Sequence, residues 1–280
     1  MFLAIQFFLV FLMFPLASHS CVNHRRDDEL FKIGFMNSAA QVSTSFDGAT
    51  VGLNPSGIFQ FPLDDFQLEA IDALNQGHSV VVTAPTGSGK TLVGEYAIHR
   101  AIVHKQKVFY TTPLKALSNQ KLRDFRDQFG SENVGLMTGD LSMNRKASIV
   151  VMTTEIFRNM LYAEVDGSDD PLADVEAVVL DECHYMNDSQ RGTVWEESII
   201  HCPPSVQLVA LSATVANASQ LTDWIKTVHG PTQLVISEHR PVPLQFSFCS
   251  AKGLHPLLND AGTGLHPNCK VWRPPKGYKK

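Results

Sequence analysis

Two hydrophobic periods alternate along residues 63–229, and they predict strands and helices in turn. Short runs of consecutive apolar residues are typical of strands that are buried on both faces. Such runs predict one strand that begins at Ser79 and further strands over residues 107–113, 133–140, 147–154, 176–182 and 206–214. Between these runs, apolar residues recur every three or four positions. This spacing predicts helices over residues 63–77, 92–104, 114–130, 155–165, 194–202 and 218–229.

Strands that alternate with helices predict an α/β fold. We expect a mostly parallel sheet with helices on both faces, because parallel strands need crossovers that cover the sheet. The expected domain spans residues 58–238, after an apolar leader at 1–21 and a poorly ordered leader at 22–57. Residues 239–280 are expected to form a linker and a tail, since Pro241 and Pro243 favour extended chain and the end is rich in Gly, Pro and Asn.

The charge of the chain limits how it could bind nucleic acid. The 280 residues carry a formal net charge of -5, so such contact has to come from a local patch. The five cysteines include no Cys-x-x-Cys pair. Their spacing suggests no zinc site or disulfide framework, and it favours a reducing compartment.

The amino terminus raises a separate question. Residues 2–16 are apolar and no Lys or Arg precedes them, so the segment resembles a signal-peptide core that lacks its positive region. It is too short to predict a membrane span, and it lacks the Arg-rich pattern of a transit peptide. The alternative is a wrongly predicted first exon. In either case we exclude the segment from the fold and expect no stable membrane association.

The segment "APTGSGKT", Ala84 to Thr91, has the spacing of a phosphate-binding P-loop. Gly87 and Gly89 let the backbone bend so that N–H groups face phosphate oxygens. Lys90 is expected to reach the β- and γ-phosphates, and the Thr91 hydroxyl to bind Mg²⁺. The alternative is a glycine-rich turn with an unrelated lysine, but a strand before and a helix after favour the P-loop. The expected nucleotide contacts are Ala84, Pro85, Thr86, Gly87, Ser88, Gly89, Lys90 and Thr91.

An acidic pair, Asp181 and Glu182, ends a strand of the same predicted sheet. A magnesium ion held by phosphates needs an anionic partner, and Asp181 is expected to supply it directly or through water. Glu182 is then placed to orient and deprotonate an attacking water. A solvated strand end is the alternative for an isolated Asp-Glu, and the P-loop upstream makes it the weaker interpretation.

Several further segments follow one another in a fixed order: "FPLDDFQLEAI", the P-loop, "TTPLKALSNQK", "TTEIFRNMLY", "DECHYMNDSQRGTVWEESII", "LSAT" and "EHRPVPL". In this order they resemble the superfamily-two DExH-box RNA helicases of the superkiller type, in the plant chloroplast and cyanobacterial-like branch. The resemblance covers residues 61–258. It implies a RecA-like P-loop domain that binds ATP and Mg²⁺, in an enzyme that hydrolyses ATP to remodel RNA.

The resemblance also implies roles for matching positions. Gln67 would read the adenine base. His184 would contact the γ-phosphate side or a partner domain, and so complete a catalytic set with Lys90, Asp181 and Glu182. Coupling between nucleotide and nucleic acid would fall to Ser212, Ala213 and Thr214. The residues that would lie along single-stranded RNA are Pro113, Lys115, Ser118, Asn119, Gly139, Asp140, Thr153, Thr154 and Glu155.

Each of these assignments has an alternative. His184 could be a surface histidine, and Ser212–Thr214 could be an ordinary strand end. Lys115 and Lys121 could belong to a solvated helix face. Cys183 lies beside the acidic pair, and we assign it no chemistry.

The resemblance finally implies a second RecA-like domain. In these helicases ATP lies between two such domains, and the second supplies arginines that stabilise the transferring phosphoryl group. The final segment "VWRPPKGYKK" departs from the family, so we expect a truncated chain that does not unwind RNA alone. The alternatives are a non-catalytic nucleotide- and RNA-binding regulatory fragment, or a DNA helicase fragment. The resemblance favours an intracellular place, in the chloroplast or the nucleus and cytoplasm, and the signal-like leader conflicts with it.

Overall fold

The computed structural model describes residues 53–162, 171–250, 253–259 and 262–266. The predictions for the leader at 1–21, for most of the leader at 22–57 and for the end of the tail lie outside these residues. None of the helices in the described ranges is both long and apolar enough to cross a membrane.

The centre of the fold is an eight-stranded sheet. All its neighbouring strands are parallel except β3 and β4, which are antiparallel. The predicted mostly parallel sheet is therefore confirmed. In spatial order the strands are β4 (Ser142–Met143), β3 (Val134–Met137), β5 (Ile149–Thr153), β2 (Lys107–Thr112), β6 (Val175–Leu180), β7 (Gln207–Ser212), β1 (Ser79–Thr83) and β8 (Thr232–Ile236).

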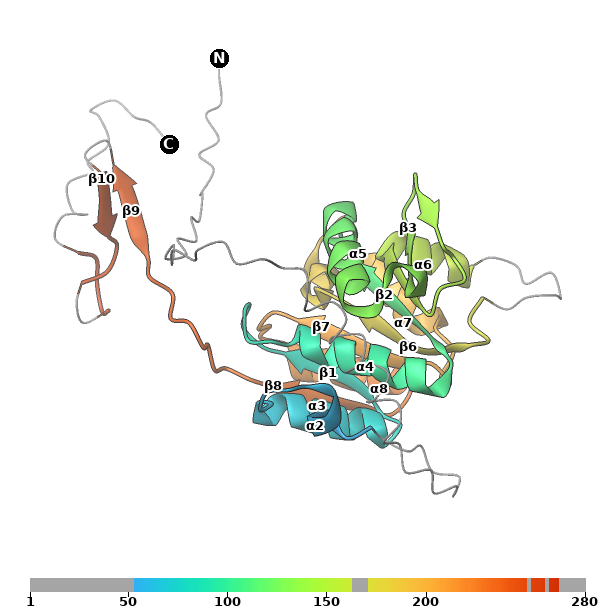
Figure 1. The fold of residues 1–280 in the computed structure, drawn as a ribbon. Coiled ribbons are helices and arrows are strands. Elements are labelled where there is room, and N and C mark those ends of the chain that lie inside the picture. The colour runs from blue at the N-terminus through green and yellow to red at the C-terminus, as the bar shows by residue number, and fades with distance from the viewer. Residues whose placement is uncertain (1–52, 163–170, 251–252, 260–261, 267–280) are drawn as a thin grey trace, which may run out of the picture. The chain divides into compact units, whose positions relative to one another are not determined.

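Helices cover both faces of this sheet, as the sequence predicts (Figure 1). One face packs against α3 (Asp65–Asn75), α4 (Thr91–His104) and α5 (Lys115–Phe129). The other packs against α6 (Thr154–Leu161), α7 (Gly192–His201) and α8 (Ala218–Val228). Successive strand residues face opposite layers, so Val80 and Val82 join the first core and Val81 joins the second.

Local signals in the sequence account for several helix ends. A capping box at Asp64 and Gln67 starts α3. Gly130 ends α5 with a φ of 87°, which a residue with a side chain rarely adopts. A short 3₁₀ turn, η2 (Ser131–Asn133), leads into β3, and a second, η3 (Cys183–Asn187), follows the acidic pair.

Two short elements lie where the sequence predicts irregular chain. Helix α2 (Pro55–Ile58) begins inside the predicted leader, because Asn54 caps its amino end and Pro55 presets its first turn. Strands β9 (Ser247–Ser250) and β10 (Gly253–Pro256) form an antiparallel hairpin in the predicted linker and tail. Each is too short to show a hydrophobic period.

Candidate functional site

The predicted functional residues lie along one edge of the sheet, at the carboxyl ends of its parallel strands. We call this the carboxyl edge. The strand order divides it into two halves. The P-loop follows β1, Ser212 ends β7 and the acidic pair follows β6. The predicted nucleic-acid residues follow the next three strands, β2, β5 and β3. The sheet therefore places the two groups side by side, with β6 and β2 adjacent at the boundary.

The P-loop joins β1 to the start of α4. Gly87 and Gly89 have φ values of 83° and 86°, which side chains disfavour. Lys90, directly before the helix, is only 6% exposed. The Ser88 hydroxyl oxygen is buried and has no hydrogen-bond partner among the described residues. Backbone N–H groups at the amino end of a long helix, with a lysine and a free hydroxyl, form a cradle that suits phosphate.

Gln67 lies against this loop from helix α3. Its Nε2 donates to the Gly89 carbonyl at 3.0 Å, and its Oε1 accepts from the Asp64 backbone N–H at 2.9 Å. A Cβ atom at Gly89 would lie 2.8 Å from this Nε2. The carboxamide keeps one N–H and one lone pair for a further partner. Gln67 therefore holds the P-loop in this structure, and an adenine base would have to use its remaining bonding capacity.

The acidic pair is held in a strained and specific geometry. Asp181 is 8% exposed; its Oδ2 accepts from the Tyr110 hydroxyl at 2.8 Å and its Oδ1 from the Glu182 backbone N–H at 2.9 Å. Glu182 has a left-handed backbone, with φ 54° and ψ 43°. Such a conformation at a residue other than glycine is concentrated at functional sites. It ends the strand and directs the chain into η3.

His184 and Cys183 follow the pair in η3. His184 Nδ1 lies 3.2 Å from Glu182 Oε2, without the alignment of a hydrogen bond. Cys183 is fully buried, and burial raises the pKa of its thiol to about 12. The thiol therefore stays neutral, which agrees with its having no part in the chemistry. A fully buried Tyr110 likewise has a pKa well above its usual range, chiefly because of burial and then because of Asp181, so its hydroxyl remains a hydrogen-bond donor.

The donor groups at this half of the edge fit a magnesium ion. Mg²⁺ prefers carboxylate, hydroxyl and water oxygens. Each Asp181 oxygen accepts one bond from the protein and so retains a lone pair. Thr91 is half-buried at the first residue of α4, with its side chain next to the loop that would hold phosphates. Asp181 and Thr91 are therefore the candidate metal ligands.

Ser212 bonds the start of the P-loop through its backbone. It pairs with Thr83 in the sheet, and its carbonyl accepts from the Ala84 N–H at 3.2 Å. Its side chain is fully buried and bonds the Ala213 carbonyl, whereas Thr214 is exposed. A cavity of about 280 Å³ lies behind this strand end, and its lining includes His184, Ser212 and Trp224. Of the three predicted coupling residues, Ser212 borders this cavity, together with residues of η3.

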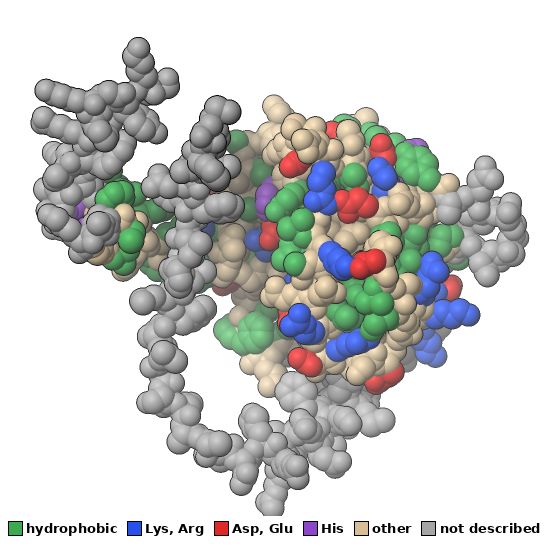
Figure 2. All heavy atoms as spheres, turned by 90° about the horizontal axis from the view of Figure 1, so that it is seen from above, with side chains coloured by type: hydrophobic (Ala, Val, Ile, Leu, Met, Phe, Trp, Pro, Cys, Tyr) green, Lys and Arg blue, Asp and Glu red, His purple; other side chains and the backbone are tan. Residues whose placement is uncertain are grey.

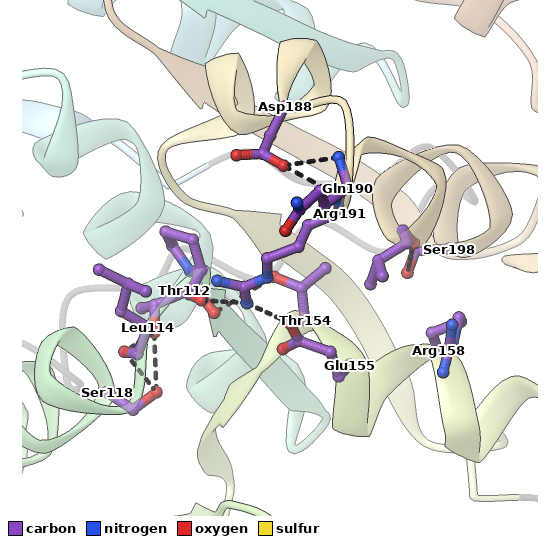
Figure 3. Close-up of polar contacts among 12 residues, drawn as sticks. Thr112, Leu114, Ser118, Thr154, Glu155, Arg158, Asp188, Gln190, Arg191 and Ser198 are labelled. Atoms are coloured by element: carbon purple, nitrogen blue, oxygen red, sulfur yellow. Dashed lines mark hydrogen bonds and ion pairs between the residues drawn. The ribbon is translucent and has the colours of Figure 1, made fainter.

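Polar contacts join several of the predicted nucleic-acid residues, and Figure 3 shows those of Ser118 and Thr154 around Thr112. The Thr154 hydroxyl donates to the Thr112 carbonyl at 3.2 Å, and the Thr112 and Ser118 hydroxyls lie 2.7 Å apart. Lys115 and Asp140 form an ion pair, and the hydrogen bond from Lys115 is the main cause that lowers the Asp140 pKa. The loops after β2, β3 and β5 are therefore fastened to one another.

These residues differ in how far they face solvent. Ser118 and Thr154 are fully buried, and Pro113 is buried as well, so their side chains shape the loops from within. Thr153, Asn119 and Glu155 are half-buried, whereas Lys115, Gly139 and Asp140 are exposed. On the face shown in Figure 2, Lys and Arg side chains are interspersed with Asp and Glu rather than gathered in one basic patch. Lys115 is the one basic side chain among the predicted nucleic-acid residues, and it is paired with Asp140, so a nucleic acid would meet a few ordered groups there instead of a broad positive surface.

The sequence analysis did not identify three residues that contact the site. Tyr110 bonds Asp181, Arg191 bonds the Pro113 carbonyl at 2.7 Å, and Arg240 bonds the Thr86 carbonyl at 3.2 Å. Tyr110 stands three residues before Pro113 on a predicted strand. Its alternation on that strand indicates burial, but not which carboxylate its hydroxyl would meet. The two arginines lie in segments where charge alone suggests only solvent exposure.

Comparison with known proteins matches this region to a family. Residues 64–221 match the family model described as DEAD/DEAH box helicase. The chain is 54% identical over 211 residues to the chloroplastic DExH-box ATP-dependent RNA helicase DExH15 of Arabidopsis thaliana, which covers 75% of this chain and 18% of that protein. It is 46% identical over 216 residues to the antiviral helicase SKI2 of Saccharomyces cerevisiae, which covers 77% of this chain and 16% of that protein. The chain thus spans less than a fifth of the length of these two relatives.

Solved structures give the same fold. The helicase Lhr of Mycobacterium smegmatis, bound to single-stranded DNA and AMP-PNP, aligns with a TM-score of 0.52 and 27% identity, over 68% of this chain and 27% of that one. The helicase MrfA bound to DNA aligns with a TM-score of 0.51 over 63% of this chain and 27% of that one. At 22% identity, the second likeness concerns the fold alone.

Proposed function

The chain belongs to the DEAD/DEAH box helicase family, and we propose that it is the ATP-binding RecA-like domain of an ATP-dependent RNA helicase. Family membership implies the use of a nucleotide, and the carboxyl edge offers one place for it. The observation that carries the proposal is the position of Asp181 and Glu182 on the same edge as the P-loop, with only β7, which ends at Ser212, between their two strands.

Each residue then has a chemical task. The P-loop N–H groups and Lys90 hold the phosphates of ATP. Thr91 and Asp181 would hold Mg²⁺, and the bound ion would supply positive charge that stabilises the negative charge on the phosphates. Glu182 accepts the proton of the attacking water, and its left-handed backbone sets the point where the chain leaves the strand end. His184 lies beside Glu182 and would contact the γ-phosphate side or a partner domain, so that hydrolysis is coupled to movement.

We further propose that the nucleic acid is single-stranded RNA, held along the ends of β2, β5 and β3. The relative DExH15 is named as an RNA helicase, whereas the aligned Lhr structure holds single-stranded DNA. Competition between RNA and DNA strands of the same sequence tests this directly, because a protein can distinguish them at the 2′-hydroxyl. RNA should displace a labelled RNA at a lower concentration than DNA does. Equal displacement would indicate a helicase domain without this preference.

The described residues contain one RecA-like sheet. Helicases of the type that this chain resembles take catalytic arginines from a second RecA-like domain. We therefore expect the chain to bind Mg-ATP and to turn it over slowly by itself. A second RecA-like domain, in the same protein or added in trans, should be needed for strand separation.

The test is nucleotide binding and phosphate release by the purified chain, with and without single-stranded RNA. Lys90→Ala should abolish binding of a fluorescent ATP, because it removes the buried cation of the cradle. Glu182→Gln should keep that binding and abolish RNA-stimulated phosphate release. If Lys90→Ala bound the nucleotide as tightly as the unchanged chain, the P-loop assignment would be wrong.

A further inference from the structure

The tyrosine that contacts Asp181 is fully buried and has close neighbours on several sides. Tyr110 is fully buried on β2, and its hydroxyl donates to Asp181 Oδ2 at 2.8 Å. The other oxygen, Oδ1, accepts from the Glu182 backbone N–H at 2.9 Å. Two bonds to two different oxygens fix the rotation of a carboxylate, whereas a single bond would leave it free to turn.

The tyrosine ring is itself held on several sides. Phe125 packs against it edge-on, with ring centroids 4.9 Å apart, and the Lys121 ammonium lies 5.5 Å from its centroid. Gly94 lets α4 come close from a third side, because a Cβ there would lie only 3.2 Å from Tyr110 Cε2. Gly94 lies one helical turn after Thr91, so the ring packs beneath the helix that the P-loop starts.

We propose that Tyr110 is a positioning residue for the metal site: it holds the Asp181 carboxylate so that its remaining lone pairs are presented to Mg²⁺. The inference rests on the proposed Mg-ATP function and names a residue that this function did not include. Partners that orient a metal ligand commonly change metal affinity by about 10- to 100-fold when they are removed. The tyrosine would not touch the nucleotide or the metal.

A purely structural role for this hydrogen bond is the competing explanation. Under that explanation, loss of the hydroxyl would lower stability and leave the metal dependence of the folded protein unchanged. The chain offers a matched control in Tyr96. This tyrosine is also fully buried, and its hydroxyl bonds the Leu53 carbonyl at 2.9 Å and Asn75 Oδ1 at 2.7 Å, away from the acidic pair.

The experiment compares Tyr110→Phe with Tyr96→Phe in the complete 280-residue chain. Binding of a fluorescent adenosine diphosphate is titrated with MgCl₂, and again in excess EDTA. Tyr110→Phe should raise by about tenfold the Mg²⁺ concentration that gives half of the maximal increase in nucleotide binding. The affinity for the nucleotide measured in excess EDTA should change little. Tyr96→Phe should leave both values unchanged. An unchanged Mg²⁺ midpoint in a folded Tyr110→Phe protein would overturn the proposal.

Two further measurements separate the possible failures. If the unchanged chain does not bind the nucleotide with or without Mg²⁺, the proposed function fails, and not only the role of Tyr110. Gly94→Ala keeps the Tyr110 hydroxyl but adds a Cβ that presses on its ring. It should therefore also raise the Mg²⁺ midpoint, and it can be measured even if Tyr110→Phe does not fold. Electron paramagnetic resonance of bound Mn²⁺ measures metal affinity in the nucleotide complex without turnover. A Gly94→Ala midpoint equal to that of the unchanged chain would also count against the proposal.

Discussion

The guanidinium of Arg191 forms an ion pair with Glu155 at the start of α6 (Figure 3). The same nitrogen, Nη2, donates to the Pro113 carbonyl at the end of β2. Arg191 itself lies just after η3, where Asp188 Oδ1 accepts its backbone N–H at 3.0 Å. One side chain therefore joins the loop that follows the acidic pair to two of the predicted nucleic-acid segments.

This arrangement predicts a specific effect of Arg191→Gln. Without the guanidinium, the segments after β2 and β5 lose their contacts with Arg191, and the groups that would meet RNA become less ordered. A half-exposed ion pair with one carbonyl bond contributes about 1 kcal/mol, so binding of single-stranded RNA should weaken about fivefold. Binding of a fluorescent ATP should stay unchanged. Fluorescence anisotropy with a labelled RNA measures the first quantity.

Arg158 provides the matched control. It pairs with Glu197 at 3.5 Å, and the side chains of this pair are exposed to a similar degree as those of Arg191 and Glu155. Arg158→Gln removes the same charge, but the ion pair that is lost joins only α6 and α7. If both variants lost RNA affinity equally, the loss would reflect net charge, and the tie through Arg191 would have no special role.

Gln67 gives a second prediction, about base selectivity. Gln67→Ala removes the bond to the Gly89 carbonyl and frees the P-loop, which should weaken ATP and GTP binding alike. If the carboxamide also reads adenine, ATP should lose more affinity than GTP. We expect this larger loss for ATP, measured by competition against a fluorescent nucleotide. Equal losses would mean that Gln67 serves only to hold the loop.

Gly192 at the start of α7 gives a third prediction, about stability. A Cβ there would lie 2.2 Å from the Met186 carbonyl oxygen, so the backbone of η3 would have to move. Gly192→Ala should lower the free energy of unfolding by about 2 kcal/mol, as overpacking does. Gly139→Ala is the control, because a Cβ at Gly139 meets nothing within 4 Å. Urea denaturation of both variants measures the difference, and equal stabilities would contradict the predicted clash.

The sequence predicted the parallel sheet because its signals are local. The apolar run at 79–83 and the helical spacing after Thr91 each specify an element without reference to distant residues. The nucleotide segments were predictable for the same reason, since the P-loop spacing and the acidic pair each follow a strand. The ends of parallel strands share one edge, so these segments had to lie on the same side of the sheet.

Contacts between distant segments were not predictable in this way. The fully buried Arg100 bonds Glu176, Gln207 and the Leu74 carbonyl, which are far apart in the chain. The helical spacing places Arg100 on a helix, but a charged side chain there suggests exposure to solvent and not full burial. The contact of Tyr110 with Asp181 could not be predicted for the same reason, since it joins two segments that are distant in the chain. Strand order decides that β2 lies beside β6, and no local pattern encodes that order.

The pH dependence of stability gives a fourth prediction, through His99. Its ring lies on α4 between Phe59 and Phe129, with centroids 6.0 and 5.0 Å away, and burial lowers its pKa to about 4. An unfolded histidine titrates near 6.5, so between these values the unfolded state binds more protons. Stability should therefore fall as the pH is lowered from 7 to 5, by about 2 kcal/mol from this residue.

The variant His99→Leu tests this assignment. It removes the titrating group from the aromatic cluster, so urea unfolding at pH 7 and pH 5 should give more similar free energies than in the unchanged chain. The difference should not vanish, because burial also lowers the pKa of His229 and that residue acts in the same direction. His201→Gln changes an exposed ring and should keep the original dependence. If His99→Leu lost as much stability between the two pH values as the unchanged chain, another group would be responsible for the acid sensitivity.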